Sequence, residues 1–177
     1  MNGTALLART TSVDETRDLA AALAELARPS DLLVLVGDLG AGKTAFTQGF
    51  GRGLGIDDQI TSPTFALVQS YTGRLDLYHL DVYRLDQVAE ALDLGLSELL
   101  DDGSVTVIEW GDAITPVLPH DYLEVHLRFV DDDDAAAPAV DRREIELVPV
   151  GPRWSARVRV LGAAIAPWAS TEDGSSC

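Results

Sequence analysis

One stretch of the sequence, residues 37–44 (GDLGAGKT), constrains the fold more strongly than any other. It follows an apolar run at residues 32–36 that suits a buried strand, and it precedes a helical pattern at residues 44–54. A strand, the pattern G-x-x-x-x-G-K-S/T and a helix, in this order, form the context of a phosphate-binding loop. A chance glycine-rich turn before Lys-Thr would rarely carry both flanking elements, so the sequence predicts a nucleotide phosphate site here.

Each residue of this loop has a defined role in such a site. Gly37 and Gly42 accept backbone angles that other residues avoid, which lets successive N–H groups surround phosphate oxygens beside the positive end of the helix. Lys43 would bring a positive charge to the β- and γ-phosphates, and the Thr44 hydroxyl would ligate Mg²⁺. The candidate nucleotide-binding residues of the loop are Asp38, Leu39, Gly40, Ala41, Gly42, Lys43, Thr44 and Ala45.

The length of 177 residues predicts one domain with a short tail. We expect residues 1–150 to form the P-loop domain. Residues 151–177 are expected to be a C-terminal extension whose polar last residues are disordered.

The charge of the chain limits its partners. Its 13 basic and 29 acidic residues give a formal net charge of −16, which is not the footprint of a protein that binds nucleic acid by itself. Any RNA in its biology is therefore expected to be held by a partner.

The cysteine content and the lack of targeting patterns indicate the cellular compartment. The single cysteine, Cys177, permits no disulfide within the chain, which fits a reducing compartment. The N-terminus does not resemble a signal peptide, and no apolar run approaches the ~20 residues of a membrane span. We expect a cytoplasmic protein without membrane association.

The remaining patterns place the loop in an α/β fold of P-loop NTPase type, with a mixed, mostly parallel central sheet between helices in three layers, α/β/α. Ser12 and Glu15 form a capping box that opens a helix to about Arg28. The other expected elements are a hairpin of residues 65–71 and 75–80, a helix at 88–100, strands at 105–108, 122–129 and 142–148, an acidic loop at 131–138, and a helix or strand at 153–168.

A second acid near the metal is expected at the end of a strand. The apolar run at residues 105–108 ends at Glu109, and in a parallel sheet such a residue emerges at the carboxyl edge beside the phosphate loop. The alternative is an ordinary exposed glutamate at a strand end.

A polar group follows the strand expected at residues 75–80. Alternation places His79, Asp81 and Tyr83 on one face. Asp81 could orient the attacking water or hold the metal through water. It could equally pair with Arg84 or cap the next helix, and the spacing favours neither interpretation.

The segment Ser62-Pro63-Thr64-Phe65 lies between the loop helix and the next strand. A loop at this position could fold over a triphosphate and place Thr64 on the γ-phosphate, as an order–disorder switch does. From the residues alone, an ordinary Ser-Pro turn is favoured.

Four motifs in this order resemble the TsaE family, the small bacterial ATPases of the tRNA threonylcarbamoyladenosine pathway. They are GDLGAGKT at 37–44, SPTF at 62–65, YHLDVYRL at 78–85 and IEW at 108–110. The resemblance implies a protein that binds ATP with Mg²⁺ and hydrolyses it slowly. It also implies action with the TsaB–TsaD pair, which transfers the threonylcarbamoyl group to A37 of tRNAs that read ANN codons.

The resemblance also implies roles for single residues. Thr44 and Glu109 would bind Mg²⁺, and Asp81 would be the catalytic acid group, so the candidate catalytic residues are Asp81, Glu109 and Lys43. Thr64 would lie in the switch-like loop. The adenine would lie near the first helix, around Thr11.

Two other functions use the same loop. A small-molecule kinase needs an acceptor pocket and usually an arginine-rich lid, whereas the arginines here are scattered and Arg142-Arg143 fits a strand pattern. A nucleotide-gated binding module with incidental hydrolysis would use the same residues as an ATPase, so the sequence separates these two poorly.

Overall fold

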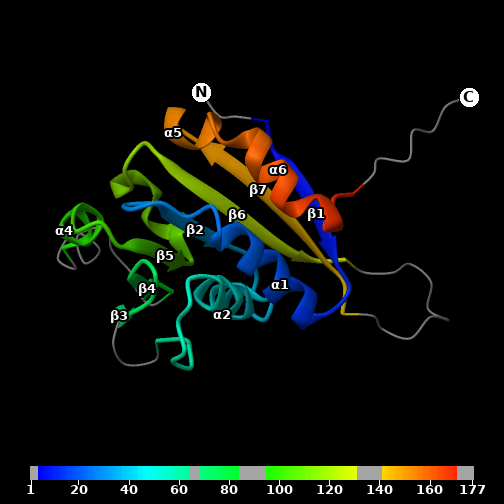
Figure 1. Cartoon of the computed structure of the whole chain (residues 1–177), viewed down its shortest axis with the longest axis horizontal. Helices are drawn as coiled ribbons and strands as arrows, with labels where there is room; N and C mark the ends of the chain where they lie inside the picture. Colours follow the sequence, from blue (N-terminus) through cyan, green and yellow to red (C-terminus); the bar gives the residue numbers. More distant parts are fainter. Residues whose placement is uncertain (1–3, 64–67, 84–94, 131–140, 171–177) are drawn as a thin grey trace, which may run out of the picture.

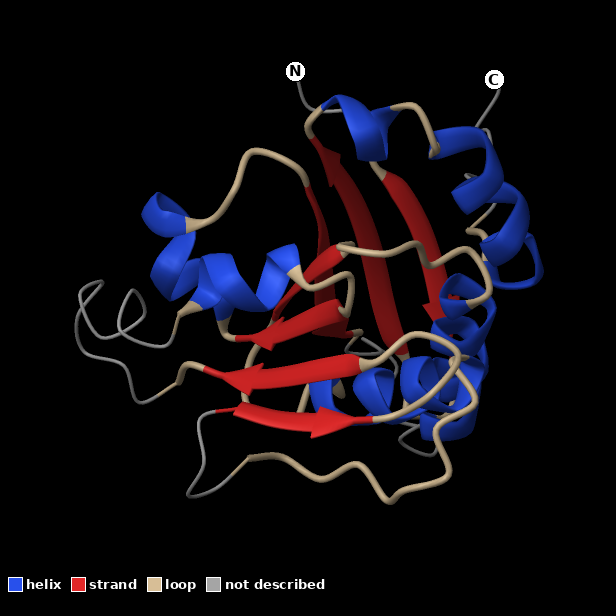
Figure 2. Ribbon diagram, turned by 60° about the vertical axis from the view of Figure 1, so that its left-hand side comes forward, coloured by secondary structure: helices blue, strands red, loops and turns tan. Residues whose placement is uncertain are grey.

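The structure, a computed structural model, describes residues 4–63, 68–83, 95–130 and 141–170. These residues build one seven-stranded sheet with helices on both faces (Figure 1, Figure 2). The strands are β1 (Leu6–Thr10), β2 (Leu32–Val36), β3 (Val68–Tyr71), β4 (Leu77–Asp81), β5 (Val105–Glu109), β6 (Tyr122–Phe129) and β7 (Arg143–Val150). The helices are α1 (Val13–Ala24), α2 (Lys43–Gly53), α4 (Leu96–Asp101), α5 (Pro152–Ser155), α6 (Val158–Ile165) and the 3₁₀ helices η1 (Gly111–Val117) and η2 (Ala166–Trp168).

The sheet has a parallel centre and antiparallel edges. Its order is β1-β7-β6-β2-β5-β4-β3, with β6, β2, β5 and β4 parallel to one another. The pairings of β3 with β4, β6 with β7 and β1 with β7 are antiparallel. The prediction of a mixed sheet with a parallel core is therefore confirmed. Strand β1, at one edge, is an element that the sequence patterns did not predict.

Helices cover the sheet on both sides, as the predicted three layers require. On one face α1, α2 and α6 contribute Leu19, Phe46 and Leu161 to a large buried cluster that includes Val125 of β6. On the other face α4 and η1 close a smaller cluster over the parallel strands, to which they contribute Leu96 and Ile114. Both faces of the central strands β2 and β5 are thus buried, which explains their largely apolar sequences.

The start of α1 differs in detail from a capping box. The Ser12 hydroxyl accepts a hydrogen bond from the backbone N–H of Glu15 at 3.1 Å, as predicted. The Glu15 carboxylate, however, accepts from the backbone N–H of Thr11 at 2.6 Å instead of that of Ser12. The helix also ends at Ala24 and not near Arg28, because the last N–H groups bond three residues back in a tighter turn.

Several expected segments fall partly or wholly outside the described residues, among them the first hairpin strand, of which 68–71 are described, and the polar tail after residue 170. Of the helix expected at 88–100, the structure describes α4, which begins after Gly95 with a φ of 67°. The acidic loop expected at 131–138 lies outside. Among the described residues, no helix combines the length and the apolar character needed to cross a membrane.

The C-terminal extension forms helices at residues 152–168, a segment for which the sequence patterns allow either a helix or a strand. Trp154, Leu161 and Ile165 of α5 and α6 belong to the large buried cluster. The Arg157 guanidinium donates to both oxygens of the buried Asp31 carboxylate, at 3.0 and 2.9 Å, and lies over the Trp154 ring. A buried ion pair therefore ties the extension to the start of β2.

Removing this arginine should destabilise the fold strongly. Arg157→Ala leaves the buried Asp31 carboxylate with only a half-exposed arginine, Arg153, 4.0 Å away, and loss of a buried partner typically costs about 3–5 kcal/mol of unfolding free energy. Arg9→Ala removes an exposed partner of Glu144 and is expected to cost less than about 1 kcal/mol. Urea unfolding of both variants measures the difference, and equal losses would contradict the structural role of the pair.

Candidate functional site

The phosphate loop lies at the carboxyl edge of the parallel strands, between β2 and α2. Gly42 has a φ of 108°, which favours glycine, and a Cβ there would lie 3.0 Å from Arg143 Nε. A Cβ on Gly37 would lie 2.4 Å from the Leu127 carbonyl oxygen, so the loop can approach β6 only with glycine at this position. Local backbone geometry therefore requires glycine at positions 37 and 42.

The Lys43 side chain is held inside the site by the loop itself. It is 5% exposed, and its Nζ donates to the carbonyl oxygens of Gly37 at 2.6 Å and Asp38 at 2.8 Å. The Trp110 ring lies against the same ammonium group, 3.7 Å from Nζ to the ring centroid. Burial lowers the pKa of Lys43, although Glu109 and other carboxylates favour its charged form.

Thr44 and Glu109 converge from α2 and β5. The Thr44 hydroxyl donates to the Glu109 carboxylate, with Oγ1 3.1 Å from Oε1 and 3.4 Å from Oε2. Glu109 is 3% exposed, so it is not the exposed strand-end glutamate of the alternative interpretation. Its Oε1 also lies 2.8 Å from Nε2 of the buried His79.

Asp81 lies beside Glu109 because β4 and β5 are parallel and the two residues are paired in register. Its Oδ2 accepts from the Ser62 hydroxyl at 3.1 Å, and its Oδ1 accepts from the backbone N–H of Tyr83 at 3.0 Å. The alternative partner Arg84 and the helix that Asp81 might cap lie outside the described residues.

These groups line one cavity of about 430 Å³. Its lining consists of Leu39, Gly40, Gly42, Lys43, Thr44, Ala45, Ser62, Asp81, Tyr83, Glu109, Trp110 and Arg143. The structure thus brings together most of the loop residues with both predicted carboxylates. Asp38 and Ala41 contribute through their carbonyl oxygens, which accept from Lys43 and Arg143.

Two predicted residues stand apart from this cavity. Thr64 lies outside the described residues. Thr11 is exposed and follows the carboxyl end of β1, at the same edge of the sheet, but it is not among the residues that line the cavity.

Arg143 is a cavity residue that the sequence analysis missed. It is 5% exposed, and its Nε donates to the Ala41 carbonyl oxygen at 2.8 Å. Its Nη1 donates to the Asp141 carboxylate at 2.9 Å. The missed signal is its position in an alternating strand, where Arg143, Ile145 and Leu147 share the buried face. An arginine at an inward position next to apolar residues indicates a partner inside the protein.

Trp110 forms one wall of the cavity together with Tyr83. Their ring centroids are 4.7 Å apart, and the Trp110 backbone has a φ of 63°, which is rare for a tryptophan. That backbone turn directs the ring from the end of β5 toward Lys43. The sequence placed Trp110 only as the residue after Glu109.

The donors present fit a magnesium ion bound with phosphate. The described residues contain no cluster of three or more His, Cys, Asp or Glu side chains arranged for a metal. Thr44 and Glu109 instead offer two hard oxygen ligands next to a phosphate loop. Mg²⁺ commonly takes one or two protein oxygens and completes its shell with substrate phosphates and water.

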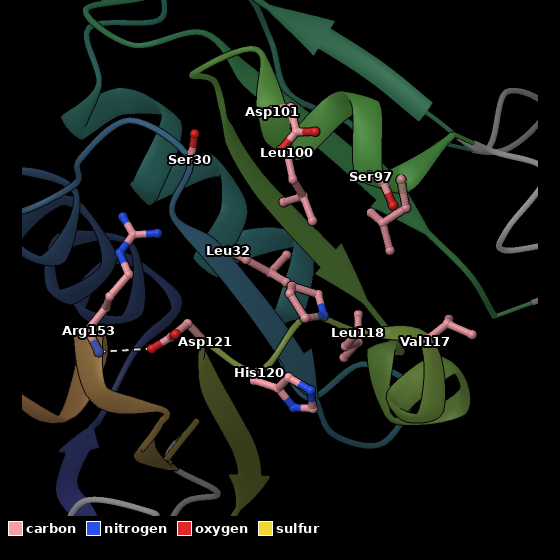
Figure 3. A pocket seen from close by; sticks show the side chains of 12 residues that line it. Ser30, Leu32, Ser97, Leu100, Asp101, Val117, Leu118, His120, Asp121 and Arg153 are labelled. Atoms are coloured by element: carbon pink, nitrogen blue, oxygen red, sulfur yellow. Dashed lines mark hydrogen bonds between the residues drawn. The ribbon is translucent and has the colours of Figure 1, made fainter.

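A larger cavity, about 590 Å³, lies at the opposite end of the parallel strands, beside the starts of β2 and β6. Figure 3 shows its apolar floor, with Leu32, Leu100 and Leu118, and a rim that includes His120. Arg153 at the rim is fixed through its backbone N–H, which donates to Asp121 at 2.8 Å. This cavity shares no residue with the phosphate loop.

The fold and the loop site together define a protein of the P-loop class. The family model described as "Threonylcarbamoyl adenosine biosynthesis protein TsaE" matches residues 10–137. The chain therefore belongs to the TsaE family.

Individual relatives agree with this assignment. The "tRNA threonylcarbamoyladenosine biosynthesis protein TsaE" of Bacillus subtilis is 42% identical over 147 residues, which are 82% of this chain and 87% of that protein. The protein of the same name from Streptomyces coelicolor is 40% identical over 151 residues, covering 82% and 98%. The crystal structure of Bacillus subtilis YdiB superposes with a TM-score of 0.74 at 37% identity, covering 92% of this chain and 97% of that one.

The lowered pKa of Lys43 predicts how pH acts on stability. Lys43 is the only lysine of the chain, and its folded pKa lies below the ordinary 10.5. Between these two values the unfolded chain binds more protons, so this residue makes stability rise with pH in that window. The unfolding free energy of the wild type, minus that of Lys43→Met, should be constant near neutral pH and increase as pH approaches 10.5.

Urea unfolding of both proteins over a pH series measures this difference, and groups common to the two chains cancel. A difference that stays flat or falls up to 10.5 would show that Lys43 is not held in a desolvated position.

Proposed function

We propose that this chain binds ATP with Mg²⁺ and hydrolyses it slowly, in support of the threonylcarbamoylation of A37 in tRNAs that read ANN codons. It would act on the TsaB–TsaD complex and would not perform the transfer itself. The observation that carries the proposal is the single cavity in which Lys43, the Thr44–Glu109 pair and Asp81 meet. The names of the relatives, which place them in tRNA threonylcarbamoyladenosine biosynthesis, support the pathway.

Phosphate binding would change the partners of Lys43. Its ammonium group now donates to two loop carbonyl oxygens, and a triphosphate would offer it charged acceptors instead. A phosphate oxygen carries negative charge and a carbonyl oxygen does not, so the ammonium group gains an ion–ion attraction in the exchange, which favours it. The backbone N–H groups of the loop and of the start of α2 would hold the remaining phosphate oxygens.

Thr44 and Glu109 would hold the metal. Mg²⁺, when bound, would neutralise charge on the β- and γ-phosphates. The Thr44 hydroxyl, which now donates to Glu109, would turn its oxygen to the ion, and the Glu109 carboxylate would be free of that hydrogen bond.

Asp81 would position the attacking water. Each of its oxygens accepts one hydrogen bond and keeps capacity for a second, from water. The water would attack the γ-phosphorus as the bond to the β-phosphate oxygen breaks, which releases ADP and inorganic phosphate. Positioning and charge neutralisation supply most of the catalysis in such reactions.

The acidic chain is suited to leave the tRNA to its partners. A formal charge of −16 repels a phosphate backbone, and repulsion of this kind persists over about 8 Å at physiological salt. We therefore assign tRNA binding to the partner complex and nucleotide binding to this chain.

Asp81→Ala should separate binding from turnover. The variant keeps Lys43 and the loop, so its affinity for ATP in the presence of Mg²⁺ should stay within about threefold, whereas hydrolysis should fall by about 100-fold or more. Calorimetric titration and phosphate release measure the two effects. Asp76→Ala, which changes an exposed aspartate before the same strand, is the control and should retain both. Normal hydrolysis by the Asp81 variant would remove it from the catalytic group.

Phosphate release with and without the TsaB–TsaD complex tests the pathway role. We expect the complex to stimulate release, and Lys43→Ala to abolish it because the triphosphate loses its cation. No stimulation, together with transfer of the γ-phosphate to a small acceptor, would favour the kinase instead. If the chain assembled with the TsaB–TsaD complex in a nucleotide-dependent way, and assembly were unchanged without hydrolysis, the binding module would be favoured.

A further inference from the structure

His79 contacts Glu109 of the phosphate-loop site but does not line the cavity of that site. It belongs to β4, two residues before Asp81, and its side chain is fully buried. Its Nε2 lies 2.8 Å from Glu109 Oε1, across the parallel pairing of β4 with β5. The alternation of the strand places His79 on the same face as Asp81.

We propose that His79 is a positioning residue for the magnesium site. It would hold the Glu109 carboxylate in the orientation in which Glu109 and Thr44 together receive the ion. The inference rests on the proposed function, because it concerns the same Mg²⁺ and nucleotide.

The hydrogen bonds define the form of the imidazole. A carboxylate oxygen only accepts, so the contact at 2.8 Å requires a hydrogen on Nε2. The other ring nitrogen, Nδ1, is buried and has no hydrogen-bond partner among the residues that the structure describes. A hydrogen on Nδ1 would be an unpaired buried donor next to apolar side chains, which is costly. We therefore take the ring to donate through Nε2 to Glu109.

The two oxygens of Glu109 are thereby made unequal. Oε1 accepts from His79 and is the oxygen closer to the Thr44 hydroxyl, at 3.1 Å, whereas Oε2 makes the longer contact, at 3.4 Å. With Oε1 held by the ring, Oε2 is the oxygen left to bind a cation. Hydrogen bonds of this kind behind a ligand commonly change metal affinity by about 10–100-fold.

The hydrogen bond from His79 also competes with any turn of Glu109 toward Lys43. Among the carboxylates near Lys43, Glu109 most strongly favours the charged form of the lysine. A glutamate without its anchor could turn to this ammonium group, and a direct ion pair would occupy the metal ligand and the phosphate-binding cation at once. His79 thus keeps the two charges available for a nucleotide.

Substitution by glutamine and asparagine tests the role with matched amides. The amide nitrogen of Gln reaches about as far as Nε2 of histidine, whereas that of Asn reaches only about as far as Nδ1. His79→Gln can therefore donate to Glu109, and His79→Asn cannot. The readout is the affinity of the full-length protein for a non-hydrolysable ATP analogue, measured by calorimetry in Mg²⁺ and again in EDTA.

We expect the affinity for the analogue to depend less on Mg²⁺ in the variant that cannot donate a hydrogen bond to Glu109. In His79→Asn the gain in affinity on adding Mg²⁺ should shrink by about 10-fold or more, while the affinity in EDTA stays within about threefold of the wild type. His79→Gln should keep the wild-type gain within about threefold.

Three outcomes would overturn the proposal. Both variants could retain the full effect of Mg²⁺, both could lose it equally, or His79→Asn could lose affinity to the same extent in Mg²⁺ and in EDTA, as a purely structural residue would. A wild-type protein that does not bind the analogue would instead refute the proposed function, so the two failures are distinguishable.

Discussion

The Glu109 carboxylate is 3% exposed where β4, β5 and α2 meet, and it can remain buried there because hydrogen-bond donors surround it. A buried carboxylate without hydrogen bonds is strongly unfavourable. His79 from β4 and Thr44 from α2 supply these bonds, and Lys43 lies close enough to be favoured in its charged form. The parallel register of β2, β5 and β4 is what delivers these groups to one edge of the sheet. Fold and site are thus two consequences of one arrangement.

Several features at this edge lower the stability of the free protein. Burial of Lys43 removes water from its ammonium group, which disfavours the charged form and lowers the pKa. Trp110 holds a left-handed backbone conformation, which costs about 1–3 kcal/mol in a residue other than glycine. The opposite side of the molecule compensates, because the Arg157–Asp31 pair and the apolar side chains of α5 and α6 fasten the C-terminal extension to the sheet. Strain collected at one edge and supported elsewhere is typical of functional sites.

The parallel core, the loop and the positions of Asp81 and Glu109 could be predicted because they follow from short-range patterns. An apolar run followed by a glycine-rich turn, or ended by an acid, has the same meaning in any parallel sheet. No short-range motif identifies Arg143, because its partner Ala41 is 102 positions away. Its inward position in an alternating strand indicates a buried partner but does not say which residue that partner is. Strand β1 is short, and only its pairing with β7 defines it. The helix α6 was ambiguous because tertiary burial, which local propensity does not encode, decides its structure.

The central claim is that Lys43, Thr44 and Glu109 form one receptor for a nucleotide phosphate and its metal. A crystal structure of the full chain with Mg²⁺ and a non-hydrolysable ATP analogue tests it most directly. The account predicts that Lys43 leaves the Gly37 and Asp38 carbonyl oxygens for the phosphates, and that Thr44 and Glu109 oxygens lie about 2.0–2.1 Å from the ion. A nucleotide bound elsewhere, with Lys43 still bonded to the loop and Glu109 away from the metal, would contradict it.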